Sequence, residues 1–121
     1  MQISGRWRIE EMDLWDRDAL DLVQPAFIEF GRDRSGSFGF IAVEGWLDCH
    51  EAQIDGRAGI EFSWQGYDDG DQVSGRGWTV LGEDRFLRGR IFFHQGDDSG
   101  FRAARQERPA LPTRKQPARR R

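Results

Sequence analysis

A histidine followed three residues later by an aspartate is the pair in this sequence closest to acid–base chemistry. His94 ends an alternating apolar segment, and Asp97 lies in the turn-like stretch that follows. A carboxylate beside an imidazole can orient it as a general base. No serine or cysteine in a recognisable nucleophile motif accompanies the pair, and Ser99 follows no nucleophile-elbow pattern. We therefore interpret His94 as a strand-end histidine and expect no enzyme, with acid–base chemistry by His94 and Asp97 as the alternative.

Two turn-like segments concentrate carboxylates that could hold a cation. Asp68, Asp69 and Asp71 occur in the first, and Asp97 and Asp98 in the second. Such oxygens can bind Ca²⁺ or attract a cationic ligand or peptide, but the spacing does not fit an EF-hand loop. The alternative is that they only form turns, since hairpins favour Asp and Gly. The sequence predicts no metal site and no cofactor.

Aromatic residues near bends in the chain are a third kind of candidate. The chain has 5 Trp and 9 Phe, and Trp15 and Trp46 both lie close to predicted bends. Exposed there, they could line the mouth of a pocket or a surface for a partner. The alternative is that a small domain needs large side chains to fill its core.

The single cysteine, Cys49, excludes an internal disulfide and a cysteine-based zinc site. Cys49 and His50 are adjacent on a predicted strand, so they point to opposite faces and cannot form one site. No apolar run approaches the ~20 residues of a membrane-spanning helix, and the N-terminus lacks a secretory signal. We expect a cytoplasmic protein without membrane contact.

The charge is divided between two parts of the chain. Residues 1–107 carry 12 arginines and all 21 acidic residues, whereas residues 108–121 carry the remaining six basic residues and three of the four prolines. The second composition cannot bury enough surface to fold. We predict a β-barrel domain at 1–107, with net charge −9, and a disordered basic tail at 108–121. The acidic domain would repel nucleic acid, so only the tail suits such a partner.

The apolar residues of 1–107 alternate, and turn signals recur about every 8–12 residues. This pattern predicts an all-β fold, a single antiparallel meander of seven to eight strands that closes into a small barrel. One short helix is expected after the first strand, between Asp16 and Gln24, and a bulge at Glu10–Glu11 explains a slip in the alternation. Gly45 is either a turn or a bend.

Successive turns of a meander alternate between the two ends of the sheet. The segments 66–75 and 95–100 are separated by two strands, so we expect them at the same end, called here the acidic end. The helical segment joins this end if Gly45 is a true turn. The predicted ligand-binding residues are Trp15, Trp46, Tyr67, Asp68, Asp69, Asp71, His94, Asp97 and Asp98.

Gly5-Arg6-Trp7, near the start of the first strand, is similar to the Gly-x-Trp signature of lipocalins and the wider calycin group. The resemblance implies that Trp7 packs under the barrel floor with a basic residue of the last strand, Arg102 or Arg105, across its ring. It also implies that a small apolar ligand binds inside the barrel. Residues 1–107 as a whole also resemble a small bacterial protein family to which we attach no role.

Together these features lead us to expect a non-catalytic binding module that engages a small ligand or a basic peptide segment at the acidic end. The alternative is a protein–protein regulator, an inhibitor or adaptor, that uses exposed aromatic residues on the barrel exterior. An interior pocket favours the first function, and a filled barrel with an exposed apolar patch favours the second.

Overall fold

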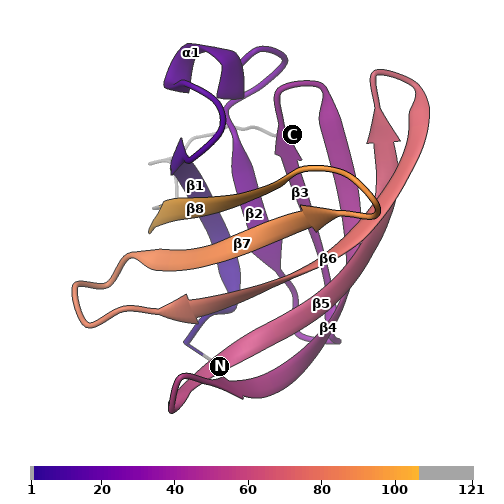
Figure 1. The fold of residues 1–121 in the computed structure, drawn as a ribbon. Coiled ribbons are helices and arrows are strands. Elements are labelled where there is room, and N and C mark those ends of the chain that lie inside the picture. The colour runs from indigo at the N-terminus through magenta and orange to yellow at the C-terminus, as the bar shows by residue number, and fades with distance from the viewer. Residues whose placement is uncertain (1, 107–121) are drawn as a thin grey trace, which may run out of the picture.

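A computed structural model describes residues 2–106, and the basic tail predicted at 108–121 lies outside the described residues. Eight antiparallel strands follow one another around a closed barrel in which β8 pairs with β1, as Figure 1 shows. The all-β meander predicted from the sequence is therefore confirmed. The elements are β1 (Gly5–Met12), α1 (Arg17–Leu20), β2 (Phe27–Phe30), β3 (Ser35–Phe40), β4 (Val43–Ile54), β5 (Arg57–Asp68), β6 (Asp71–Leu81), β7 (Leu87–Phe93) and β8 (Asp98–Arg105).

The slip in the first strand is a bulge, as predicted. The register between β1 and β8 shifts between Ile9 and Glu11, which leaves Glu10 as the extra residue. Before the bulge Trp7 and Ile9 face the core, and after it Met12 does so. The extra residue therefore lets both halves of β1 bury their apolar side chains.

The only helix within residues 2–106 is the single turn α1, inside the predicted stretch. Asp16 caps it, because its carboxylate accepts a hydrogen bond from the Ala19 backbone N–H at 3.0 Å. Leu20 is fully buried, and its carbonyl accepts a hydrogen bond from the Ile41 N–H at 2.8 Å. These contacts hold the segment over one end of the barrel. Within the described residues, no helix is long and apolar enough to cross a membrane.

Two turns differ from the sequence-based expectation. The chain reverses between Phe40 and Val43, and Gly45 lies inside β4 opposite Phe38. A Cβ on Gly45 would lie 2.6 Å from the Phe38 ring, so this glycine makes room for an aromatic side chain rather than for a turn. Because the chain reverses just before Val43, α1 still lies at the acidic end, as we expected for a turn at Gly45.

The second difference is the stretch 66–71, which we expected to be a loop. Instead β5 continues to Asp68 and β6 begins at Asp71. Only Asp69 and Gly70 form the turn, with φ of +50° and +92°. Positive φ at both positions matches the twist of the flanking strands, so a two-residue turn suffices.

Side chains fill the interior of the barrel. Trp7, Phe62 and Trp64 are at most 3% exposed, whereas Phe93 is only partly buried. The ring centroids of Phe38 and Trp64 are 4.9 Å apart, and those of Trp64 and Phe93 are 5.2 Å apart. Such close edge-to-face contacts are typical of a packed aromatic core.

The floor of the barrel contains the contact expected for Trp7. The Trp7 indole N–H donates to the Ile3 carbonyl at 2.9 Å, and the Arg105 guanidinium carbon lies 4.3 Å from the centre of the indole ring. This distance is within the range of a cation–π interaction. The predicted arginine from the last strand is therefore Arg105; Arg102 lies instead over the Phe86 ring.

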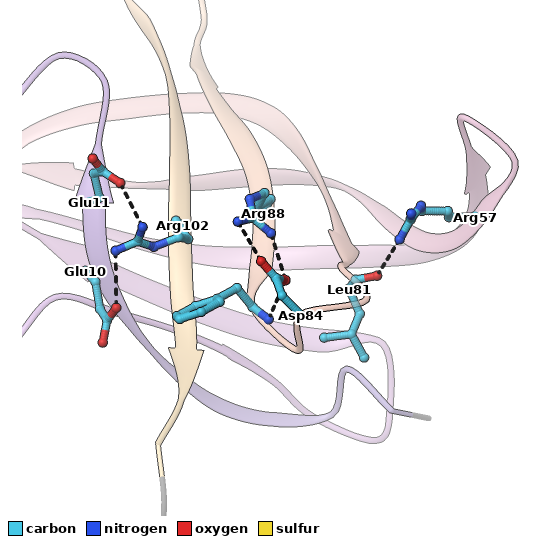
Figure 2. Close-up of polar contacts among 8 residues, drawn as sticks. Glu10, Glu11, Arg57, Leu81, Asp84, Arg88 and Arg102 are labelled. Carbon is cyan, nitrogen blue, oxygen red and sulfur yellow. Dashed lines mark hydrogen bonds and ion pairs between the residues drawn. The ribbon is translucent and has the colours of Figure 1, made fainter.

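Many carboxylates on the outer surface away from the acidic end are paired with arginines. Figure 2 shows Arg102 between Glu10 and Glu11, and Arg88 against Asp84. Two hydrogen bonds of 3.0 and 2.9 Å join the Arg88 guanidinium to the Asp84 carboxylate. They are the main reason that the pKa of Asp84 is lowered to about 2, with a further contribution from the Phe86 N–H.

Candidate functional site

Three of the predicted site residues border one groove on the outer surface, which we call the outer groove. Its volume is about 780 Å³, and it is lined by Trp46, Gln65, Gly66, Tyr67, Gln72, Val73, Ser74, Phe93 and His94. The strand register explains why they meet. Trp46 is opposite Gln65, Gln65 is opposite Ser74, and the His94 N–H donates to the Ser74 carbonyl at 2.8 Å. A row of side chains therefore crosses β4, β5 and β6 and ends at His94, directly after β7.

Trp46 and Tyr67 form an exposed aromatic pair at this groove. Their side chains are 52% and 43% exposed, although large aromatic residues are mostly buried in a domain of this kind. The ring centroids are 6.3 Å apart and the ring planes meet at 81°. Two nearly perpendicular rings form an open corner that can contact a cation or an apolar group on two sides.

Carboxylates occupy neighbouring positions on the strands that carry the aromatic pair, although Asp68 and Asp71 point to the opposite face of the sheet from Tyr67. Glu44 is the register partner of Tyr67, and Asp68 and Asp71 flank the adjacent turn at Asp69. None of these four carboxylates forms an ion pair with another described residue. This region is therefore negative without local compensation, which favours a positively charged ligand.

Of the other two predicted carboxylates, Asp98 forms an ion pair, whereas Asp97 forms none with another described residue. Asp98 pairs with Arg90, which also reaches Asp13 at 3.3 Å. The Asp97 carbonyl accepts a hydrogen bond from the Phe93 N–H, and no hydrogen bond joins Asp97 to the His94 ring among the described residues. Residues 2–106 also contain no group of three or more His, Cys, Asp or Glu side chains that could hold a metal ion.

Trp15 is separated from the outer groove and belongs to the core. It is partly buried, and its ring centroid lies 5.5 Å from that of Phe40. Trp15 therefore does not line the outer groove, and its role in ligand binding stays a prediction.

Four residues of this region were not among the predicted site residues: Glu44, Gln65, Gln72 and Ser74. All four point outward because they occupy alternate positions of long, regular strands. The alternation was visible in the sequence for β4 and β5. Their position beside Trp46 was not, because it depends on the strand registers set by the turns at Asp55–Gly56 and Asp69–Gly70.

Cys49 lies apart from the outer groove and is buried on the inner face of β4, and His50 points outward as expected. Burial raises the pKa of the Cys49 thiol to about 11, with a smaller contribution from the negative charge of Asp48. The thiol is therefore protonated at neutral pH and is a poor nucleophile.

Comparison with known proteins gives no relative from which to transfer a role. The chain matches no protein-family model, no curated protein and no solved structure at a significant level. The groove and its surroundings must therefore be interpreted from their own chemistry.

Proposed function

We propose that this protein is a non-catalytic binding module that engages a basic peptide segment in the outer groove at the acidic end. The observation that carries the proposal is the exposed, nearly perpendicular pair of Trp46 and Tyr67. An arginine or lysine side chain seated in this corner would contact both rings and lie close to Glu44. Gln65, Gln72 and Ser74 add neutral hydrogen-bonding groups for a peptide backbone.

The filled interior supports an external site over an internal one. The aromatic contacts among Phe38, Trp64 and Phe93 occupy the space in which a barrel of this size would hold a small ligand. We therefore place the ligand on the outer surface, where a peptide can lie across several strands. In this proposal the calycin resemblance extends to the barrel floor, where Arg105 over Trp7 supports it, and not to the apolar ligand inside.

The binding should be modest and sensitive to salt. A cation–π contact at an exposed aromatic residue contributes about 0.5–1 kcal/mol, and exposed carboxylates are screened at physiological ionic strength. Specificity would come from the combination of ring contacts and charge rather than from one strong bond.

Fluorescence anisotropy of a labelled nonapeptide of alternating arginine and serine tests the proposal. Trp46→Ala and Tyr67→Ala should each weaken binding about fivefold, which corresponds to the loss of about 1 kcal/mol. Val23→Ala removes an exposed apolar side chain that does not line the outer groove and should leave peptide binding unchanged. Equal affinity of the peptide for the wild type and both aromatic variants would contradict the proposal.

A second candidate function is a protein–protein regulator that uses the same aromatic pair against a folded partner. The exposed side chains of Leu14, Leu22 and Val23 beside α1 favour it, because they extend the apolar surface at this end of the barrel. Under this alternative, Leu22→Asp should abolish capture of the partner. Under the peptide proposal, it should not affect peptide affinity.

A further inference from the structure

Part of the edge of β4 has no partner among residues 2–106. The pairing of β4 with β3 ends at Asp48 opposite Ser35, followed by one hydrogen bond from the Cys49 N–H to the Arg34 carbonyl at 2.8 Å. β4 then continues to Ile54, and no strand of residues 2–106 pairs with it on that side. Figure 1 shows the β4–β5 hairpin extending beyond the body of the barrel.

The hairpin turn determines which backbone groups are free along this edge. Asp55 and Gly56 form a two-residue turn with φ of +51° and +78°, so Ile54 and Arg57 are a hydrogen-bonded pair. Backbone groups alternate in direction along a strand. Glu51 and Gln53 therefore direct their N–H and C=O groups away from β5, toward the open side.

The residues that the structure describes leave space beside this edge. A groove of about 240 Å³ lies there, and its lining includes Arg32, Glu51 and Ile60. Unpaired edge groups beside free space are the usual template for adding another strand.

We propose that the β4 edge pairs with the β4 edge of a second copy of this chain, antiparallel and centred on Ala52. In this register Glu51 lies opposite Gln53 of the second copy. By symmetry, Gln53 lies opposite Glu51 of the second copy. The two pairs would form four backbone hydrogen bonds. Ala52 would face Ala52 of the second copy across the two-fold axis.

The side chains of the edge are complementary to themselves in this register. Glu51 meets a neutral amide rather than a second carboxylate, and His50 meets Ile54. Asp55 of the second copy comes opposite Cys49, whose carbonyl already binds the Arg34 guanidinium at 3.1 Å. The charged residues brought together there, Arg34 and Asp55 of the second copy, are therefore of opposite sign.

The free end of β6 is less suited to such pairing. It extends beyond β7 by three residues, Asp71 to Val73, and Gln72 alone of these points its backbone groups to the open side. It also carries Asp71, one of the carboxylates without an ion pair at the acidic end. The β4 edge is longer and has a self-complementary pattern, which favours a second copy there.

Disulfide trapping in the full-length chain tests the register. Ala52 and its symmetry mate would be a non-hydrogen-bonded pair with Cα atoms about 4.5 Å apart, which is within disulfide range. Under mild oxidation, Ala52→Cys should form a covalent dimer at least about tenfold faster than His50→Cys or Gln53→Cys alone. A mixture of Glu51→Cys and Gln53→Cys should form the mixed dimer in preference to either homodimer. Native Cys49 is buried, and the wild type serves as the control for any disulfide that Cys49 itself forms.

A backbone variant separates strand pairing from random collision. Gln53→Pro removes the edge N–H without touching the β4–β5 hydrogen bonds, so it should abolish trapping of Ala52→Cys. Gln53→Thr keeps the N–H and should preserve trapping. Equal trapping rates for Ala52→Cys and His50→Cys, or undiminished trapping with Gln53→Pro in a folded protein, would overturn the proposal.

Discussion

The guanidinium of Arg105 on the last strand lies over the indole of Trp7 on the first strand, with its carbon 4.3 Å from the ring centre. The same guanidinium donates to the Ser4 carbonyl at 2.8 Å and contacts the Gln2 carbonyl. Because β1 and β8 are the strands whose pairing closes the barrel, this contact ties the two ends of the fold together.

Loss of this contact should destabilise the protein. Arg105→Ala removes a cation–π interaction and two charge-assisted hydrogen bonds, so we expect the free energy of unfolding to fall by about 1–2 kcal/mol. Urea denaturation followed by tryptophan fluorescence measures the change. Arg57→Ala, at an exposed arginine of the hairpin tip, is the matched control. A loss no greater than that of the control would contradict this role for Arg105.

Gly66 should not tolerate a side chain. A Cβ at this position would lie 1.7 Å from the Glu44 carbonyl oxygen, and this backbone atom cannot move without disturbing the β4–β5 pairing. Gly66→Ala should therefore lower the free energy of unfolding by about 3 kcal/mol. Ser63→Ala, at an exposed position of the same strand, should change it little. Equal denaturation midpoints for the two variants would show that the close approach is absent.

Because of its ion pair with Arg88, the Asp84 carboxyl should titrate at an unusually low pH. The pKa of Asp84 is lowered to about 2, chiefly by the Arg88 guanidinium, so the contribution of this contact is present above pH about 4. It is lost as the pH falls through about 2, because protonation removes the charge that Arg88 binds. Carboxyl ¹³C shifts should give a midpoint near 2 for Asp84. In Arg88→Gln the midpoint should rise toward 3.8, and an unchanged midpoint would contradict the assignment.

The buried thiol of Cys49 should react slowly. With its pKa raised to about 11 by burial, its thiolate fraction at pH 8 is about a hundredfold below that of a free cysteine. Iodoacetamide should therefore modify the native protein slowly and the urea-unfolded protein rapidly, as measured by mass spectrometry. Modification of the native protein at the rate of an unstructured cysteine peptide would contradict this environment.

The general fold could be predicted from the sequence because the alternation of apolar and polar residues and the turn signals are properties of short stretches of the chain. The bulge in β1 was visible from the change of phase between Ile9 and Met12. The exact turns were harder to predict. The stretch from Gly66 to Asp71 is rich in residues that favour turns, yet hydrogen bonding between β5 and β6 extends the strands until only Asp69 and Gly70 remain outside.

The candidate site could be predicted only in part, for the same reason. Trp46 was selected as an aromatic residue near a bend, Tyr67 as part of an acidic segment and His94 as a strand-end histidine, and the structure places all three at one groove. Asp98 was selected as a carboxylate of a turn-like segment but pairs with Arg90. Which carboxylates lack a partner depends on strand register, a tertiary property that no local pattern carries.

The most direct test of the proposed function is the indole N–H resonance of Trp46 in a ¹H–¹⁵N spectrum during titration with the arginine–serine nonapeptide. Binding in the outer groove predicts a saturable shift of the Trp46 resonance, while those of buried Trp7 and Trp64 stay in place. The shift should weaken as salt is added, and the same peptide with glutamate in place of arginine should cause none. A Trp46 resonance that does not move while the peptide binds elsewhere, or no binding at low salt, would contradict the account.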